Sequence, residues 1–243
     1  MPSTKLSVNV NKVATLRNSR GGSDPDVLEA VRVCVNAGAP GITVHPRADQ
    51  RHIRPADVRH IADFLAGIPQ VEFNIEGDPR PEVLDLVLTV RPTQCTLVPV
   101  QPGEITSQAG WQPSTSIDGL RSIVSAMKKI GVRVSLFVDA DPAAVQWAAE
   151  VGGDRIELYT EPFARAFEAG RGDESFSRYA EMAELAHSLG LGVNAGHDLD
   201  LRNLSVFRRL PHLDEVSIGH ALVSHALYVG LDRSVRAYLD ALR

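Results

Sequence analysis

The chain has 243 residues, of which 44% are hydrophobic, and its formal net charge at pH 7 is −5. This length and apolar content allow one core of barrel size, so we predict a single domain over residues 1–243. The acidic balance disfavours nucleic acid as a partner, because nucleic-acid binding needs a basic face. No apolar run has the length of a signal peptide or a membrane span, so we expect a cytoplasmic protein with no membrane partner.

One pattern recurs along the chain: a helical run ends at a glycine, and a short β-branched segment follows it. It occurs at residues 36–44, 128–138, 149–159 and 187–195. Glycine supplies the left-handed residue that ends a helix, and β-branched residues favour a strand. The repetition predicts strands that alternate with helices.

Eight strands are expected, each followed by a helical pattern. In chain order the strands cover residues 6–10, 41–44, 71–75, 94–98, 133–138, 155–158, 191–194 and 215–218. Amphipathic helices are clearest at residues 26–37, 117–130, 142–151 and 176–189, and a last helix is expected at roughly 221–242. Eight alternations in this length predict an α/β fold, a closed parallel (β/α)8 TIM barrel.

Two features qualify this prediction. Residues 99–116 and 160–175 are rich in Gly, Pro and Ser and are expected to form long loops at strand ends. An open doubly wound sheet is the alternative fold. That fold should carry a GxGxxG fingerprint after its first strand, and VNVNKVATLRNSRGG has none, so the barrel is favoured.

In a barrel of this kind, the catalytic residues lie at the carboxyl ends of the strands and in the loops that lead to the following helices. Taken singly, each polar residue at these positions has a structural explanation, since a lone histidine after a strand is more often a hydrogen-bonded structural residue. Together, several histidines and two glutamates at one barrel end give groups that exchange protons near neutral pH. The candidates at strand ends are Asn9, Asn11, Lys12, Arg17, Arg20, His45, Arg47, His52, Asn74, Glu76, Thr106, Glu157, Asn194, His197, Asp198, Gly219 and His220.

The same positions indicate anion binding. The step from Gly219 to His220 enters a helix and offers backbone N–H groups after strand eight, where phosphate-binding barrels commonly hold their phosphate. Arg20 and Arg47 are suited to a second anionic group. These features predict a pocket for a phosphorylated, carbonyl-bearing small molecule.

Metal and covalent chemistry have less support. The chain has no HxH after strand one and no Asp after strand eight, so no metal site of the amidohydrolase type is expected. A Schiff-base aldolase needs a lysine at a strand end, and Lys12 is the only candidate. Acid–base chemistry without a cofactor is therefore the leading prediction.

The segments that carry these residues resemble the pyridoxine 5′-phosphate synthase family. They are LSVNVNKVATLRNSRGG, GITVHPRADQRHIR, FNIEG, TLVP followed by EITSQAGW, VSLFVDAD, RIELYTEP, VNAGHDL and EVSIGHAL. The resemblance implies a (β/α)8 barrel that assembles as a homo-oligomer and makes vitamin B6 de novo. It also implies that 3-amino-2-oxopropyl phosphate condenses with 1-deoxy-D-xylulose 5-phosphate, with release of phosphate and water and without a metal or organic cofactor.

The resemblance also implies a role for each matched residue. His45 and Glu76 are expected to be general bases, His197 is expected to return protons to leaving hydroxyls, and Glu157 is expected to stabilise the transition state. The expected ligands of the aminoketone phosphate are Asn9, Arg20, Asp198 as the residue after His197, Gly219 and His220. The expected ligands of the sugar phosphate are Asn11, Lys12, Arg47, His52 and Thr106.

Two positions depart from the family pattern. Many members have Asp-His where this chain has Asn11 and Lys12, which removes a negative charge and adds a positive one. Asp198 stands where glycine is common. A carboxylate next to a bound phosphate is unfavourable unless it points away, since like charges at ~4 Å repel by about 1 kcal/mol even in water.

Two other functions remain open from the sequence. One is a phosphosugar aldolase or isomerase that uses Lys12. The other is a barrel that binds B6 phosphates without making them. The number of proton-exchanging groups at one barrel end exceeds what binding requires, so a synthase is favoured.

Overall fold

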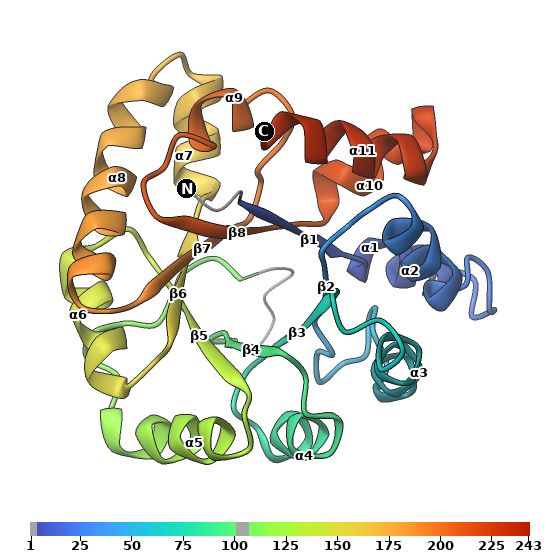
Figure 1. Cartoon of the computed structure of the whole chain (residues 1–243), viewed down its shortest axis with the longest axis horizontal. Coiled ribbons are helices and arrows are strands. Elements are labelled where there is room, and N and C mark those ends of the chain that lie inside the picture. Colours follow the sequence, from blue (N-terminus) through green and yellow to red (C-terminus); the bar gives the residue numbers. More distant parts are fainter. Residues whose placement is uncertain (1–3, 101–106) are drawn as a thin grey trace.

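The computed structural model describes residues 4–100 and 107–243. In these residues the strands lie in chain order around a closed barrel, and each pairs in parallel with the next until β8 pairs with β1. Figure 1 looks along the barrel, with the strands around its centre and the helices outside them. The predicted (β/α)8 barrel is confirmed. The strands are β1 (Lys5–Asn9), β2 (Gly41–Val44), β3 (Glu72–Gly77), β4 (Gln94–Leu97), β5 (Arg133–Val138), β6 (Arg155–Tyr159), β7 (Gly192–Gly196) and β8 (Leu213–Ile218).

The helices between the strands follow local signals. Helix α6 is an example: Asp141 accepts hydrogen bonds from the N–H groups of Ala143 and Ala144, and the helix ends at Gly152 with φ 93°. A side-chain cap at the start and a left-handed glycine at the end are what the sequence pattern requires. The helices are α1 (Asn11–Asn18), α2 (Val27–Asn36), α3 (Pro55–Leu65), α4 (Pro81–Val90), α5 (Ile117–Lys129), α6 (Pro142–Val151), α7 (Glu161–Glu168), α8 (Gly172–Ser188), α9 (Leu204–Phe207), α10 (His220–Val229) and α11 (Leu231–Ala241).

Two sequence predictions about the helices are wrong. Residues 160–175 are not a long loop, because α7 and the start of α8 lie within them. The last helix is not continuous, because Gly230 adopts φ 89° and ψ 151° and separates α10 from α11. In the described part of the chain, no helix is long and apolar enough to cross a membrane.

The interior of the barrel is polar. Gln94 on β4 donates a hydrogen bond to Glu215 on β8 (3.2 Å), and Asn194 on β7 donates to Gln94 (3.2 Å). Glu72 on β3 is paired with both Lys5 on β1 and Arg133 on β5. Contacts between such distant strands run through the interior, which in most barrels of this kind is filled by Val, Ile and Leu. Buried charges need partners, and this network supplies them below the carboxyl ends of the strands.

Candidate active site

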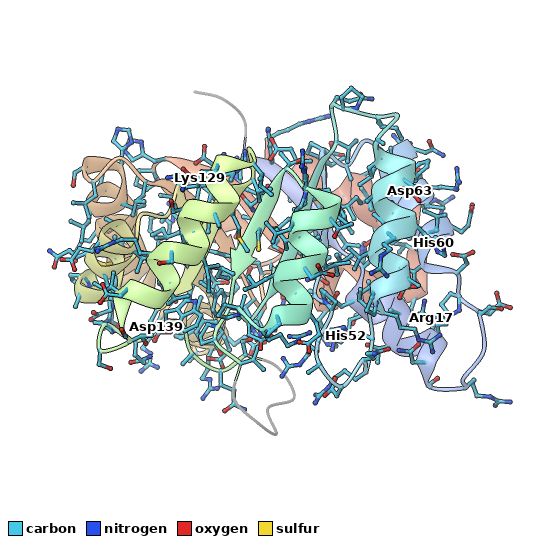
Figure 2. The ribbon with its side chains drawn as sticks, turned by 90° about the horizontal axis from the view of Figure 1, so that it is seen from below. Arg17, His52, His60, Asp63, Lys129 and Asp139 are labelled. Carbon is cyan, nitrogen blue, oxygen red and sulfur yellow. The ribbon has the colours of Figure 1, made fainter. Side chains whose placement is uncertain are left out.

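A cavity of about 380 Å³ opens at the carboxyl ends of the strands. Figure 2 shows the barrel from the side: His52, after β2, and Asp139, after β5, lie at this end, whereas Lys129, before β5, lies at the other. The barrel brings together residues from the ends of β1, β2, β3, β6, β7 and β8, which are far apart in the sequence. The predicted site residues that line the cavity are Asn9, Asn11, Lys12, His45, Arg47, His52, Glu76, Glu157, His197, Asp198, Gly219 and His220.

Among the described residues, the predicted candidates Arg17, Arg20, Asn74 and Asn194 do not line this cavity. Arg20 is exposed and does not line it, because α1 ends at Asn18 and the chain then continues on the surface. The expected contact of Arg20 with an aminoketone phosphate stays a prediction. Thr106 lies outside the described residues.

Glu76 occupies an inward position near the end of β3. Asn9 Nδ2 lies 3.4 Å from its Oε2, and Ser217 Oγ lies 3.3 Å from its Oε1. His45 Nδ1 is 3.8 Å from Oε2. Burial and, more weakly, the charge of Glu215 outweigh the hydrogen bond from Ser217 and raise the pKa of Glu76 to about 7. This carboxyl group can gain and lose a proton near neutral pH.

Glu157 lies in the cavity wall on β6 and is 3% exposed. Thr96 Oγ1 is 3.4 Å from its Oε2. Burial, and then the charges of Glu76 and Glu215, raise the pKa of Glu157 well above its usual range. A carboxyl group that is kept neutral in this way can donate a hydrogen bond.

His45 and His52 are neutral bases rather than cations. Burial is the main cause that lowers the pKa of His45 to about 3 and that of His52 to about 4, and the charge of Arg47 contributes to both shifts. His52 Nδ1 accepts a hydrogen bond from the backbone N–H of Ile53 at 2.9 Å. Neutral His52 therefore carries its proton on Nε2 and is a hydrogen-bond donor through that atom.

His197 follows β7 in an unusual backbone conformation, with φ 88°, and Asp198 has φ 60°. The ring of His197 packs against Tyr159 with 5.1 Å between ring centroids. Asp198 Oδ2 lies 3.4 Å from His197 Nδ1, and hydrogen bonding to His197 is the main cause that lowers the pKa of Asp198. The carboxylate that departs from the family pattern is therefore ionised and associated with His197.

Positive charge surrounds one side of the cavity. Arg47 is 6% exposed, and it lines the cavity together with Arg51 and Lys12. The segment that carries Arg47 and His52 is held by Arg17, which donates to Asp57 through both terminal nitrogens (2.6 and 2.9 Å) and to the carbonyl of His52 (3.2 Å). A bidentate pair of this kind fixes position as well as charge.

Asn11 has a structural contact that the sequence did not indicate. Its Oδ1 accepts a hydrogen bond from the backbone N–H of His45 (2.9 Å), and its own N–H donates to Asn9 Oδ1 (3.0 Å). The amide at this departing position thus connects the ends of β1 and β2. Only an acceptor oxygen is needed for the His45 contact, so Asn serves it as Asp would.

Comparison with known proteins places the chain in a family. The family described as Pyridoxal phosphate biosynthesis protein PdxJ matches residues 6–243. The chain belongs to the PdxJ family. Proteins named pyridoxine 5′-phosphate synthase are similar to it over 241 residues: that of Christiangramia forsetii is 53% identical, and that of Bacteroides thetaiotaomicron is 51% identical. Each alignment covers 99% of this chain and 100% of the relative. The resemblance to this enzyme family is confirmed.

Solved structures with low identity show the fold alone. A phosphoribosyl anthranilate isomerase from Thermus thermophilus has a TM-score of 0.59 and 15% identity, with 98% of each chain covered. This likeness agrees with the closed barrel and says nothing further about the chemistry of this PdxJ family member.

Three residues in the cavity or in contact with its glutamates were not predicted from the sequence. Ser217 and Thr96 contact the two glutamates from β8 and β4, and Arg51, which was not among the predicted site residues, lines the cavity. The signal for Ser217 was its position two residues before Gly219, on the same face of the strand. Among the described residues, no group of three or more His, Cys, Asp or Glu side chains is arranged to hold a metal ion.

Proposed function

We propose that this protein condenses 3-amino-2-oxopropyl phosphate with 1-deoxy-D-xylulose 5-phosphate and closes the ring of pyridoxine 5′-phosphate, with release of phosphate and water. The names of the relatives supply the product, and the sequence resemblance supplies the substrates. The observation that carries the proposal is one cavity in which His45, Glu76, Glu157 and His197 lie together with anion-binding groups. We further propose that the catalysis is acid–base and needs no cofactor.

The chemistry requires more than one proton-transfer group. Imine formation, dehydration and ring closure each move a proton, and these steps occur at different atoms of the substrates. A pKa of about 7 suits Glu76 to act as a general base. His45 Nε2 is buried and has no hydrogen-bond partner among the described residues, as expected of an atom whose partner is a substrate.

The remaining two groups have complementary roles. Glu157, kept neutral by its surroundings, is suited to donate a hydrogen bond to an oxygen that becomes negative in the transition state. His197 lines the cavity just after the end of β7, which pairs with β6, the strand of Glu157, and we assign to His197 the return of protons to leaving hydroxyls.

Two regions of the cavity are proposed to hold phosphate. The backbone at Gly219 and His220, where α10 begins, suits the aminoketone phosphate together with Asn9 and the backbone of Asp198. The sugar phosphate is assigned to Arg47 and His52 with Asn11 and Lys12, in the more positive region. The carboxylate of Asp198 is associated with His197, which supports the use of its backbone alone.

The proposal is tested by mixing the purified protein with both phosphorylated substrates and following pyridoxine 5′-phosphate and free phosphate together. Stoichiometric appearance of both products is expected. Tight binding of the substrates without product would favour a barrel that only binds them. Reduction with borohydride followed by mass spectrometry tests the aldolase alternative, in which an adduct would form on Lys12.

We also propose that the protein is a homo-oligomer, as the resemblance implies. Leu227 and Tyr228 on α10 are 72% and 89% exposed, and Leu16 on the neighbouring α1 is 54% exposed. Such large apolar side chains favour association. Light scattering coupled to size-exclusion chromatography measures the oligomeric state.

A further inference from the structure

The segment that carries His197 has a conformation that its residues disfavour. His197 and Asp198 are consecutive, and both have positive φ, 88° and 60°. For a residue with a Cβ atom, this left-handed region brings Cβ close to the following carbonyl oxygen. Such strain persists only when surrounding contacts determine the conformation, and it gathers at functional sites. We refer to these two residues as the left-handed turn.

Thr160 contacts the first residue of this turn. Its side chain is fully buried at the end of β6, and its hydroxyl lies 2.7 Å from the carbonyl oxygen of Gly196 and 2.5 Å from that of His197. The backbone N–H of Thr160 also donates to the carbonyl of Gly196, at 3.0 Å. The contact with Gly196 is therefore secured by the backbone, whereas the contact with the His197 carbonyl comes from the hydroxyl.

Asn203 contacts the second residue. It is 3% exposed, and its Nδ2 donates to the carbonyl oxygen of Asp198 at 2.9 Å. Its Oδ1 accepts from the backbone N–H of Asp200 at 2.8 Å, and its own N–H donates to Asp200 Oδ1 at 2.8 Å. The amide is thus fixed at both ends, so each carbonyl of the left-handed turn is held by one buried side chain.

The preceding residue explains why the turn must have this shape. A Cβ atom on Gly196 would lie 2.5 Å from Glu157 Oε1, so the chain passes directly over the carboxyl group of Glu157. The chain must then bend sharply to place the His197 ring beside Tyr159, where it lines the same cavity as Glu157. In either right-handed or extended conformation, His197 would direct its ring elsewhere.

We propose that Thr160 and Asn203 are positioning residues that lock the left-handed turn and thereby direct the imidazole of His197 into the cavity. The catalytic significance of this lock rests on the proposed function, in which His197 transfers protons. The lock itself is a property of the fold.

The first experiment compares Thr160→Val with Thr160→Ser. Valine has the shape of threonine but no hydroxyl, so kcat should fall at least about tenfold while KM for each substrate changes less than about threefold. Serine keeps the hydroxyl, and kcat should stay within about threefold of the parent enzyme. Ser234→Ala is the matched control: Ser234 is fully buried on α11 and its hydroxyl donates to the carbonyl of Leu222 at 2.8 Å, away from the cavity. This control should lower stability to urea without lowering kcat.

The second experiment is a double-mutant cycle between Asn203 and Asp198. Asn203→Asp keeps the size of the side chain and the acceptor for Asp200 but removes the donor to the Asp198 carbonyl. Asp198→Gly supplies a residue that adopts positive φ without strain. The loss of kcat caused by Asn203→Asp should be about tenfold in the parent protein and less than about threefold in the Asp198→Gly background. Equal losses in the two backgrounds would overturn the proposal.

A crystal structure of the Thr160→Val variant gives a readout that does not depend on turnover. We expect φ of His197 to leave the positive region and the ring to move away from Tyr159. An unchanged turn would overturn the lock, whatever the activity. If the turn moves but the parent protein makes no pyridoxine 5′-phosphate, the proposed function fails and the lock stands.

Discussion

The replacement Gly196→Ala tests how closely β7 and Glu157 are packed. The added Cβ would lie 2.5 Å from Glu157 Oε1, 3.4 Å from its Cδ and 3.3 Å from the carbonyl oxygen of Ser217. An ordinary carbon–oxygen contact is longer, so the carboxyl group must move by about 0.5–1 Å, since the strand backbone is less free to move than a side-chain end. The backbone of Gly196 itself accepts alanine, because its φ is not positive.

We expect Gly196→Ala to reduce the rate of catalysis more than it reduces the free energy of unfolding. Adding a methyl group to a packed site destabilises a fold by roughly 1–3 kcal/mol, and a side-chain end that can rotate favours the lower value. A displacement of about 1 Å in a catalytic group lowers the rate about 100-fold, or about 2.7 kcal/mol. Turnover of both substrates gives kcat, and urea unfolding gives the stability.

Gly119→Ala is the control for this replacement. Gly119 lies in α5, and a Cβ there would have nothing within 4 Å. Alanine in a helix is favoured over glycine by about 1 kcal/mol, so this variant should be slightly more stable and fully active. If Gly196→Ala were as active as the parent enzyme, the position of Glu157 would not matter and our assignment of its role would be refuted.

Three further predictions concern charge and pH. The pKa of Glu76 is about 7 in the fold, and its ordinary value is 4.5. Between these two pH values the folded state holds a proton that the unfolded chain has lost, so the stability of the fold should decrease as pH rises from 4.5 to about 7. Glu76→Gln should remove that fall in urea titrations and lower kcat/KM at least about 100-fold above pH 7; full turnover would exclude Glu76 as the base. The pH dependence of stability expected from His52 runs in the opposite direction, because its pKa is lowered from 6.5 to about 4. Its contribution to the stability of the fold is present above pH 6.5 and is lost as pH falls to about 4. The variant His52→Asn should therefore lose less stability in acid than the parent protein. Arg17→Met should cost about 3 kcal/mol in urea unfolding, because it leaves the carboxylate of Asp57 partly buried without its partner, and a loss below about 1 kcal/mol would contradict this.

Much of the fold followed from local sequence signals. A glycine that ends a helix and a β-branched segment after it are decided within a short stretch of chain, so strand order and the barrel could be predicted. The barrel topology then brings all strand ends to one face, which is why His45, Glu76, Glu157 and His197 could be grouped from the sequence.

Elements whose stability comes from distant partners could not be predicted. Helix α7 has eight residues, and its Phe163 packs against Phe207 (4.9 Å between centroids) and Tyr179 (5.9 Å). An isolated helix of this length has marginal stability in water, and α7 forms because it buries an apolar face against other helices. The exposed position of Arg20 likewise depends on where α1 ends.

The sequence by itself determined which residues reach the carboxyl end of the barrel, because strand order and alternation are local properties. The tertiary structure alone decided their chemistry. The pKa of Glu76 depends on burial and on Glu215 from a strand at the other end of the chain, and the orientation of His197 depends on Thr160 and Asn203. The proton affinity of Glu76 and the orientation of the His197 ring are set by residues that are their neighbours in space. Of these residues, Glu215 and Thr160 are distant in the sequence from the groups they affect and become their neighbours only when the barrel closes.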